Sequence, residues 1–293
     1  MNVDQLLNML FEGSVVFLMA AGLGVIFGLM RVINFAHGAF VMVGAYGALV
    51  LTQNGITPWL GIPVGFAVGV LLGVLVELVF MRRLYGRPWD DTIFATLGLS
   101  LAVVAGVSLL FGRESQFVSS PLMSVVDLGF VQASAYRYFL LGLALAVFAV
   151  LWVITNRTQL GLIARAVVAN EQLAATLGVN TKRVRQSTFV IGTALAGLAG
   201  AAVAPIGSVQ PTMGAQYLVV SFMVVLVAGS SLTSLGVVSF AYGAAQSFVT
   251  FLVSPIVGNI TLIVLTVVIM KFRQSSLEEG TVLRAPVAAT GAS

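Results

Sequence analysis

The sequence predicts an all-α polytopic membrane protein with about nine transmembrane helices, in a range of eight to ten. Three observations support this fold class. Of the 293 residues, 59% are hydrophobic and only 8% are charged, whereas soluble domains carry roughly 25% charged residues. The charges gather in clusters, and the stretches between them approach the roughly 20 apolar residues that a helix needs to cross a bilayer. Because the chain has too few charges to cover a water-facing surface, we expect lipid to surround most of it.

The candidate spans follow the apolar stretches in chain order. They are 6–29, 34–52, 59–80, 93–111, 138–155, 187–207, 217–230, 236–254 and 259–272. The last three are short or interrupted by Gly and Ser, so one of them could be re-entrant. The N-terminus lacks the basic residues of a signal peptide, so the first stretch is expected to remain as a span. Residues 1–274 should form one transmembrane domain, and the polar segment 275–293 a disordered cytoplasmic tail.

The basic residues predict the orientation. In the nine-span arrangement, 12 of the 14 Lys and Arg residues fall on the same side, and only Arg113 and Arg137 fall on the other. Cytoplasmic loops of membrane proteins carry an excess of such residues, so the richer side is cytoplasmic. The N-terminus is then outside and the C-terminus inside. The excess of cytoplasmic bases also explains the net charge of +4, which therefore gives no indication of nucleic-acid binding.

Small residues recur at helical spacing in two of the spans. They are Gly65, Gly69 and Gly73 in one span, and Gly192, Ala196 and Gly200 with the neighbouring Gly197 in the other. Such stripes let helix backbones approach closely in a membrane, where packing drives association. We therefore expect these two stripes to mark helix–helix contacts.

The composition excludes most kinds of chemistry. There are no cysteines, so disulfides and thiolate ligands are absent. The only histidine, His37, cannot build a metal site alone. Neither of the two lysines, Lys182 and Lys271, follows a glycine as a phosphate-binding loop requires. We predict no catalytic residue, metal or cofactor in this chain, and ATP hydrolysis, if it is used, in another chain.

The basic loop 156–186 is predicted to contain an amphipathic helix. Its apolar residues recur at helical spacing, Asn170 can cap a helix that begins near Glu171, and Gly178 can end it. The residues expected to share its apolar face are Leu173, Ala174 and Leu177. This face has to be buried against something. A helix that lies on the lipid surface and a helix that docks onto a partner protein are both consistent with the pattern.

Polar residues near the spans offer little for ion coupling. His37 is placed in the segment 31–38, at the expected turn between the first two spans, where a structural hydrogen bond is favoured over a proton relay. Glu77 and Glu12 are the acids nearest the spans, and Glu77 could pair with Arg82. Two other classes of membrane protein make different demands on the sequence. A self-sufficient secondary carrier would need an acid near the membrane midplane, and a membrane enzyme would need a nucleophile and a base.

Two stretches carry a resemblance to a known family. Residues 24–46 contain the sequence NFAHG at 34–38, and residues 161–178 run from Gly161 to Gly178. Together with Phe189–Gly192 and Ala194–Gly197 they resemble the permeases of branched-chain amino acid ABC importers, from about residue 10 to 275. The resemblance implies that 161–178 holds a cytoplasmic helix that couples the permease to an ATPase. The residues implied to form this contact are Arg165, Glu171, Gln172, Leu173, Ala174, Ala175, Leu177 and Gly178.

The resemblance also implies a role and partners. Signature or translocation-path candidates are Asn34, Phe35, His37 and Gly38. The implied assembly contains a second related permease, two cytoplasmic ATPases that bind ATP and Mg, and a periplasmic solute-binding protein, in a bacterial inner membrane. Branched-chain or other hydrophobic amino acids are the implied substrates, and urea, amides or aromatic acids are alternatives. Gln172 stands where the family usually has an acid, and the turn 229–236 also departs from the family pattern.

Overall fold

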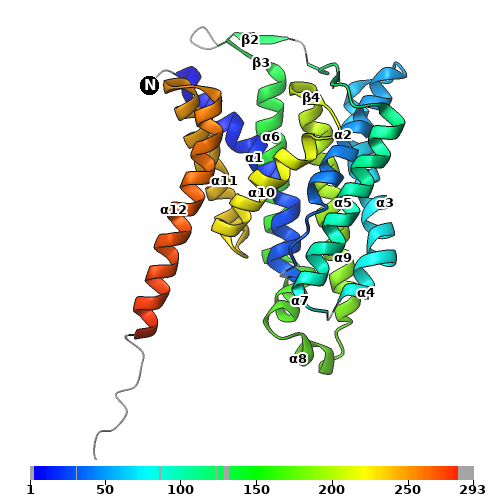
Figure 1. Cartoon of the computed structure of the whole chain (residues 1–293), viewed down its shortest axis with the longest axis vertical. Helices are drawn as coiled ribbons and strands as arrows, with labels where there is room; N and C mark the ends of the chain where they lie inside the picture. Colours follow the sequence, from blue (N-terminus) through cyan, green and yellow to red (C-terminus); the bar gives the residue numbers. More distant parts are fainter. Residues whose placement is uncertain (1–2, 31, 86, 123, 128–131, 283–293) are drawn as a thin grey trace, which may run out of the picture.

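The computed structural model describes residues 3–30, 32–85, 87–122, 124–127 and 132–282, and within them the chain is a helical bundle (Figure 1). The all-α prediction is therefore confirmed. The helices are α1 (Val3–Met30), α2 (His37–Gln53), α3 (Gly61–Val76), α4 (Arg82–Leu84), α5 (Trp89–Phe111), α6 (Ala135–Arg157), α7 (Gln159–Ala169), α8 (Glu171–Thr176), α9 (Thr181–Val203), α10 (Met213–Ala228), α11 (Leu232–Leu252) and α12 (Pro255–Val282).

Short elements connect these helices. A 3-10 turn at Pro58–Leu60 precedes α3, a π-helical turn at Glu77–Met81 joins α3 to α4, and a 3-10 turn at Ala204–Ile206 follows α9. Two small antiparallel sheets lie at one end of the bundle, where β2 is labelled in Figure 1. Their strands are β1 (Gln116–Phe117) with β4 (Ser208–Val209), and β2 (Val125–Asp127) with β3 (Gln132–Ser134).

Each of the nine predicted spans corresponds to a helix, but the described helices differ in length. Seven segments are long and apolar enough to cross a membrane: Val3–Met30, Pro58–Leu84, Asp90–Phe111, Ala135–Arg157, Thr181–Ile206, Leu232–Leu252 and Pro255–Phe272. The other two predicted spans are α2 with 17 residues and α10 with 16 residues. A rise of 1.5 Å per residue makes both about 25 Å long, shorter than a hydrocarbon core of about 30 Å.

The shortness of α2 follows from where it begins. The imidazole Nε2 of His37 lies 2.8 Å from the carbonyl oxygen of Met19. Met19 precedes the end of α1 at Met30 by eleven residues, or about 16 Å along the helix. The non-helical segment after α1 therefore runs back into the bundle before α2 starts. The predicted turn between the first two spans is therefore present, and it lies inside the bundle because the polar groups of this segment find partners within the protein.

The beginning of α10 meets the beginning of α2. A Cβ atom added to Gly38 would overlap the carbonyl oxygen of Gly214, and one added to Gly214 would overlap that of Gly38. Two short helices thus start against each other inside the bundle. Glycine is required at both positions because a methyl group would push the two helix beginnings apart.

The core is organised around α1 and α9. In their span windows 78% and 72% of the residues are buried, compared with 11% in α5 and 17% in α12. The small-residue stripes lie at the contacts of α9 with its neighbours, as predicted: Gly65 and Gly69 of α3 face Gly197 and Thr193 of α9. The outer helices present apolar side chains such as Leu109, which is 87% exposed, as expected of a surface in contact with lipid.

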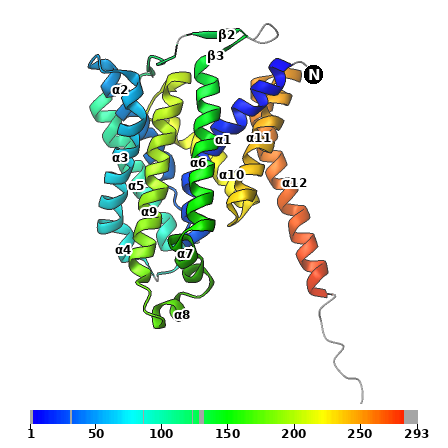
Figure 2. The same ribbon diagram turned by 180° about the vertical axis from the view of Figure 1, so that it is seen from behind.

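The two ends of the described chain lie at opposite ends of the bundle (Figures 1 and 2). The start of α1 lies beside the start of α12, whereas α4, α7, α8 and the end of α12 lie at the other end. An odd number of crossings produces this arrangement. The structure continues α12 to Val282, past the predicted start of the tail at Ser275, and residues 283–293 lie outside the described residues.

Candidate functional site

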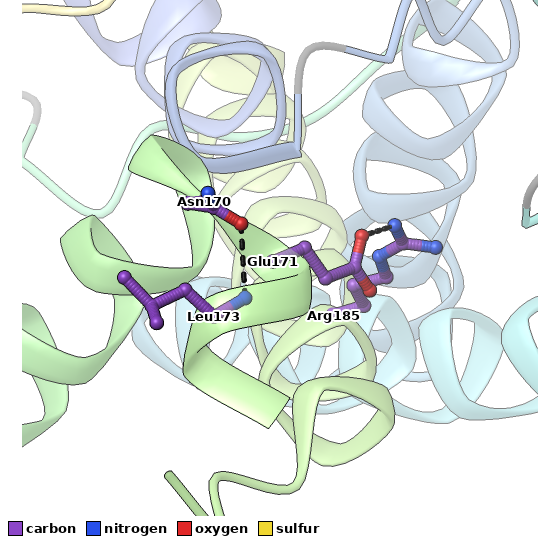
Figure 3. Close-up of polar contacts among 4 residues, drawn as sticks. All are labelled: Asn170, Glu171, Leu173 and Arg185. Carbon is purple, nitrogen blue, oxygen red and sulfur yellow. Dashed lines mark hydrogen bonds and ion pairs between the residues drawn. The ribbon is translucent and has the colours of Figure 1, made fainter. Parts of the chain in front are cut away.

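The segment between α6 and α9 forms two helices whose beginnings are capped by side chains. The Thr158 hydroxyl accepts a hydrogen bond from the backbone N–H of Gly161 at the start of α7. The Asn170 side chain accepts one from the N–H of Leu173, at 2.9 Å, at the start of α8 (Figure 3). Each cap satisfies a backbone donor that a helix beginning leaves without a partner. The predicted capping role of Asn170 is confirmed.

Helix α8 ends in a Schellman motif. Gly178 has φ +85°, its N–H donates to the Ala175 carbonyl at 3.0 Å, and the Val179 N–H donates to the Ala174 carbonyl at 3.1 Å. Glycine adopts this left-handed conformation without the penalty of a Cβ atom. The predicted end of the helix at Gly178 is therefore confirmed, and the six residues of α8 are fixed at both ends.

The exposure of the α8 side chains corrects the predicted apolar face. Leu173 is 58% exposed and Leu177 is 77% exposed, but Ala174 is only 3% exposed. The three residues do not share one free face. Ala174 is small because the fold of this chain buries it, and it is not available to a partner. The exposed leucines form the free apolar surface of α8, next to the exposed side chains of Gln172 and Ala175.

An ion pair joins α8 to α9. Arg185, in the first turns of α9, bonds to the Glu171 carboxylate (Figure 3). The Arg185 guanidinium also lies 5.0 Å from the centre of the Tyr85 ring, just after α4. Burial raises the pKa of the Tyr85 hydroxyl, and the negative charge of Glu77 raises it further while Arg185 opposes the rise. Arg185 and Tyr85 therefore connect α8 to the helical bundle.

Arg165 serves the junction between α6 and α7. Its guanidinium donates a hydrogen bond to the backbone carbonyl of Thr155, in the last turn of α6. The last carbonyls of a helix lack partners within the helix, and a basic side chain there is favourable. The coupling role implied for Arg165 remains a prediction, because the structure gives the side chain a contact within its own chain.

The signature residues lie deep in the bundle, away from α8. The Asn34 side-chain oxygen accepts the N–H of Ala36 at 3.0 Å, and the hydroxyl of Thr96 on α5 accepts the N–H of Phe35 at 3.1 Å. Non-helical backbone is stable at membrane depth only where such partners exist. Because a carbonyl only accepts, the His37 Nε2 that faces Met19 carries the proton. The expected structural hydrogen bond of His37 is thus present, and Gly38 packs on α10.

A cavity lies between the non-helical segment that leads to the signature residues and the side chain of Arg185, which pairs with Glu171 of α8. It has a volume of about 400 Å³, and its lining includes Val32 and Ile33 of the non-helical segment, Tyr85, Thr92 and Arg185. Sequence reasoning missed Tyr85, Thr96 and Arg185 as site residues. An aromatic residue two positions after a basic pair and a base near the beginning of a span are weak signals, and threonines in an apolar helix were the only sign of a bond to α5.

Apolar helices that enclose a buried non-helical segment define a multi-pass membrane protein, and such interrupted helices occur in membrane transporters. The family described as branched-chain amino acid transport system / permease component matches residues 5–271. The chain belongs to this family.

Relatives in two organisms support the assignment. The chain is 28% identical over 240 residues to a probable branched-chain amino acid transport permease protein LivH of Methanocaldococcus jannaschii, which covers 75% of this chain and 73% of the relative. It is 28% identical over 233 residues to the high-affinity branched-chain amino acid transport system permease protein LivH of Salmonella typhimurium, covering 72% and 74%. Among solved structures, PsaBC from Streptococcus pneumoniae in complex with Fab matches with a TM-score of 0.46 and 17% identity, over 89% of this chain and 90% of that one.

Proposed function

We propose that this permease is the translocation subunit of an ATP-driven importer of branched-chain or other hydrophobic amino acids. The names of the relatives support this substrate class. The observation that carries the mechanism is α8, a helix capped at both ends that exposes Leu173 and Leu177 at the end of the bundle. We propose that this surface docks onto a cytoplasmic ATPase, which alone binds ATP and Mg.

Docking explains α8 better than lipid binding does. An interfacial helix lies parallel to the membrane with a continuous apolar face among the lipid headgroups, whereas the free apolar surface at α8 consists of two leucines. In Figure 1, α8 lies beyond the ends of α4 and α7. The exposed Leu173 and Leu177 belong to this protruding segment, and the exposed Lys182 and Arg183 follow it at the beginning of α9. Two leucines one helical turn apart, on a rigid helix, fit a cleft of a partner protein.

The chain itself makes and breaks no covalent bond in this proposal. ATP binding and hydrolysis in the ATPases move α8, and the continuous helix α9 carries the movement into the bundle. The permease then alternates between outward-open and inward-open states, and its differing contacts with the substrate in the two states provide the direction. The place where α2 and α10 meet, at Gly38 and Gly214, is the candidate for the moving junction.

The proposed assembly has a second related permease, two ATPases and a periplasmic solute-binding protein that selects the substrate. The proposed location is a bacterial inner membrane, with the α8 end of the bundle in the cytoplasm and the N-terminus outside. The clustering of bases at the α8 end, including Arg82, Arg83 and Arg87, supports this orientation.

The docking proposal is tested by replacing the exposed leucines. Leu173→Ser combined with Leu177→Ser should leave the isolated permease folded, because both side chains are largely exposed. Burial of a leucine contributes roughly 1.5–3 kcal/mol, so co-purification of the ATPase should weaken about 100-fold or more. Leu160→Ser on α7 is the matched control, since Leu160 is 70% exposed but lies at the start of α7. Unchanged ATPase binding by the double variant would show that α8 lies on lipid instead.

The orientation is tested by cysteine labelling, because the chain has no cysteine of its own. A cysteine in place of Gln159, which is exposed at the start of α7, should react only from the cytoplasm. A cysteine in place of Ser119, which is exposed just after β1, should react only from outside. Labelling of Gln159→Cys by an impermeant reagent in intact cells would reverse the proposed orientation.

A further inference from the structure

A second cavity at the α8 end of the bundle is lined by charges of both signs. It has a volume of about 790 Å³ and lies between the π-helical turn Glu77–Met81 with α4 on one side and the beginning of α9 on the other. Its charged lining residues are Glu77, Glu171, Arg82, Lys182, Arg183 and Arg185. Because Glu171 and Arg185 pair with each other, three bases remain and face one acid.

Glu77 is a buried acid with a carboxylate oxygen that lacks a partner. The residue is 3% exposed, and its Oε2 has no hydrogen-bond donor. Arg82 is near enough to affect it electrostatically, but the pairing of these two side chains that the sequence suggested does not form in the described chain. A buried acid is costly without a donor or a cation. The cavity beside Glu77 is therefore suited to a positively charged group.

The local backbone explains why Glu77 faces inward. It begins the π-helical turn, in which Glu77 and Met81 are buried while the three residues between them are 45–46% exposed. π-helical turns are rare and frequently occur at functional sites. Here the turn directs the acid towards α9 and leaves Leu78, Val79 and Phe80 exposed on the outer surface beside the cavity.

The opposite part of the cavity is positive. Lys182 and Arg183 belong to the first turn of α9, a helix of 23 residues, and Arg82 lies across from them. The beginning of α9, where the Asn180 side chain accepts the N–H of Arg183 at 3.1 Å, adds the partial positive charge of a helix N-terminus to that of the bases. An anionic oxygen group is favoured on this side. Positive and negative subsites thus occur in one cavity.

We propose that this cavity binds a zwitterion, with a primary ammonium at Glu77 and an anionic oxygen group at Arg82, Lys182 and Arg183. Two sources have this chemistry: the headgroup of an aminophospholipid, or a free amino acid at this end of the permease. The second source rests on the proposed function. The exposed apolar residues beside the cavity, and its position where the spans Pro58–Leu84 and Thr181–Ile206 reach the α8 end, favour the lipid headgroup.

The test uses the purified full-length chain in detergent with equal amounts of phosphatidylethanolamine, phosphatidylglycerol and phosphatidylcholine. Native mass spectrometry counts the retained lipids. Phosphatidylethanolamine should be retained roughly tenfold over the other two, because a hydrogen bond between charged groups contributes about that factor. Glu77→Gln keeps the shape of the side chain and should abolish this preference. Lys182→Gln with Arg183→Gln should lower retention of phosphatidylethanolamine and phosphatidylglycerol together.

Arg83→Gln is the control for the substitutions of Lys182 and Arg183, since it also removes a positive charge at this end of the bundle, from an exposed side chain that does not line the cavity. It should retain the lipids as the unaltered chain does. If Glu77→Gln does not purify as a folded protein, stepwise N-methylation of phosphatidylethanolamine tests the same contact on the unaltered chain, and retention should fall as N–H donors are removed.

The two sources are separated by equilibrium dialysis with labelled leucine. Leucine binding that Glu77→Gln abolishes, with unchanged lipid retention, would assign the site to the free amino acid. Equal retention of the three lipids, together with no leucine binding that depends on Glu77, would overturn the proposal. Neither measurement involves transport or an ATPase. Failure of the proposed zwitterion site would therefore leave the proposed importer function intact.

Discussion

Replacement of Gly69 by alanine should loosen the contact between α3 and α9. Gly69 lies at the centre of the glycine stripe of α3, directly against the backbone of α9. A Cβ atom added there would lie 2.5 Å from the carbonyl oxygen of Thr193 and 2.8 Å from the Cα of Ala194. Both neighbours are backbone atoms of a central helix, so neither can rotate away as the end of a flexible side chain would.

The geometry gives the size of the effect. Ordinary contacts of a Cβ atom begin at 3.4 Å, so α3 and α9 must separate locally by about 0.9 Å. A gap of 0.5–1 Å removes roughly a quarter to a half of the dispersion energy of the atoms that face it. Overpacking of a close contact typically costs about 1–3 kcal/mol, and rigid neighbours place Gly69→Ala near 3 kcal/mol. Alanine returns up to about 1 kcal/mol through its higher helix propensity, so the net loss is about 2 kcal/mol.

A glycine without close neighbours serves as the control that separates the cost of the close contact from the gain in helix propensity. Gly142 lies within α6, and a Cβ atom added there meets nothing within 4 Å. Gly142→Ala therefore has the propensity gain alone, and the two variants should differ by about 3 kcal/mol. Unfolding of the purified chain in mixed detergent micelles, followed by tryptophan fluorescence, measures this difference. Equal stability of Gly69→Ala and Gly142→Ala would refute the conclusion that the glycine stripe sets the distance between α3 and α9.

Three further substitutions, two of them paired with a control substitution, test other parts of the structure. Thr96→Val should leave the Phe35 N–H without an acceptor and destabilise the chain by about 1–3 kcal/mol, whereas Thr96→Ser should retain most of the stability in the same unfolding assay. Gly178→Ala should strain the end of α8 by about 1–2 kcal/mol and increase proteolysis of the α7–α9 segment without changing the unfolding of the bundle. Ala174→Arg should lower the thermal stability of the isolated chain, since Ala174 is buried, while Gln172→Arg on the exposed side should not.

The features that the sequence predicted correctly depend on local patterns. Apolar length placed the nine helices, because lipid contact imposes hydrophobicity on every exposed span. The glycine stripes were visible because close helix approach requires small residues every four positions. The caps of α8 were visible because Asn170 and Gly178 are each a preferred residue for one particular backbone position.

The features that it missed depend on contacts between distant segments. The return of the chain after α1 is stabilised by a bond from Phe35 to Thr96, 61 residues away. Hydropathy places Val32 and Ile33 between two spans but does not tell whether this apolar segment lies at the membrane surface or inside the protein. The burial of Ala174 was missed for a related reason, since spacing tells which residues are neighbours on a helix but not which side its own chain covers.

Contacts between these missed residues link α8 to the interior. Glu171 bonds to Arg185, Arg185 lies on the Tyr85 ring, and both Arg185 and Tyr85 line the cavity that Val32 and Ile33 also line. The next residues after Ile33 lead directly to the buried start of α2 and its contact with α10.

A displacement of α8 therefore has two possible consequences. Either the Glu171–Arg185 pair breaks, or Arg185 moves with α8 and changes the wall of the cavity against which the non-helical segment rests. The pair is partly exposed, with 25% of the Arg185 side chain and 37% of the Glu171 side chain accessible, so water can replace it at small cost. Larger resistance comes from α9, because it is one continuous helix that begins three residues after Gly178 and packs along α1, α2 and α3. A displacement of α8 is thus resisted more by the backbone of α9 than by the Glu171–Arg185 ion pair. The ion pair determines how closely the cavity wall follows the displacement of α8.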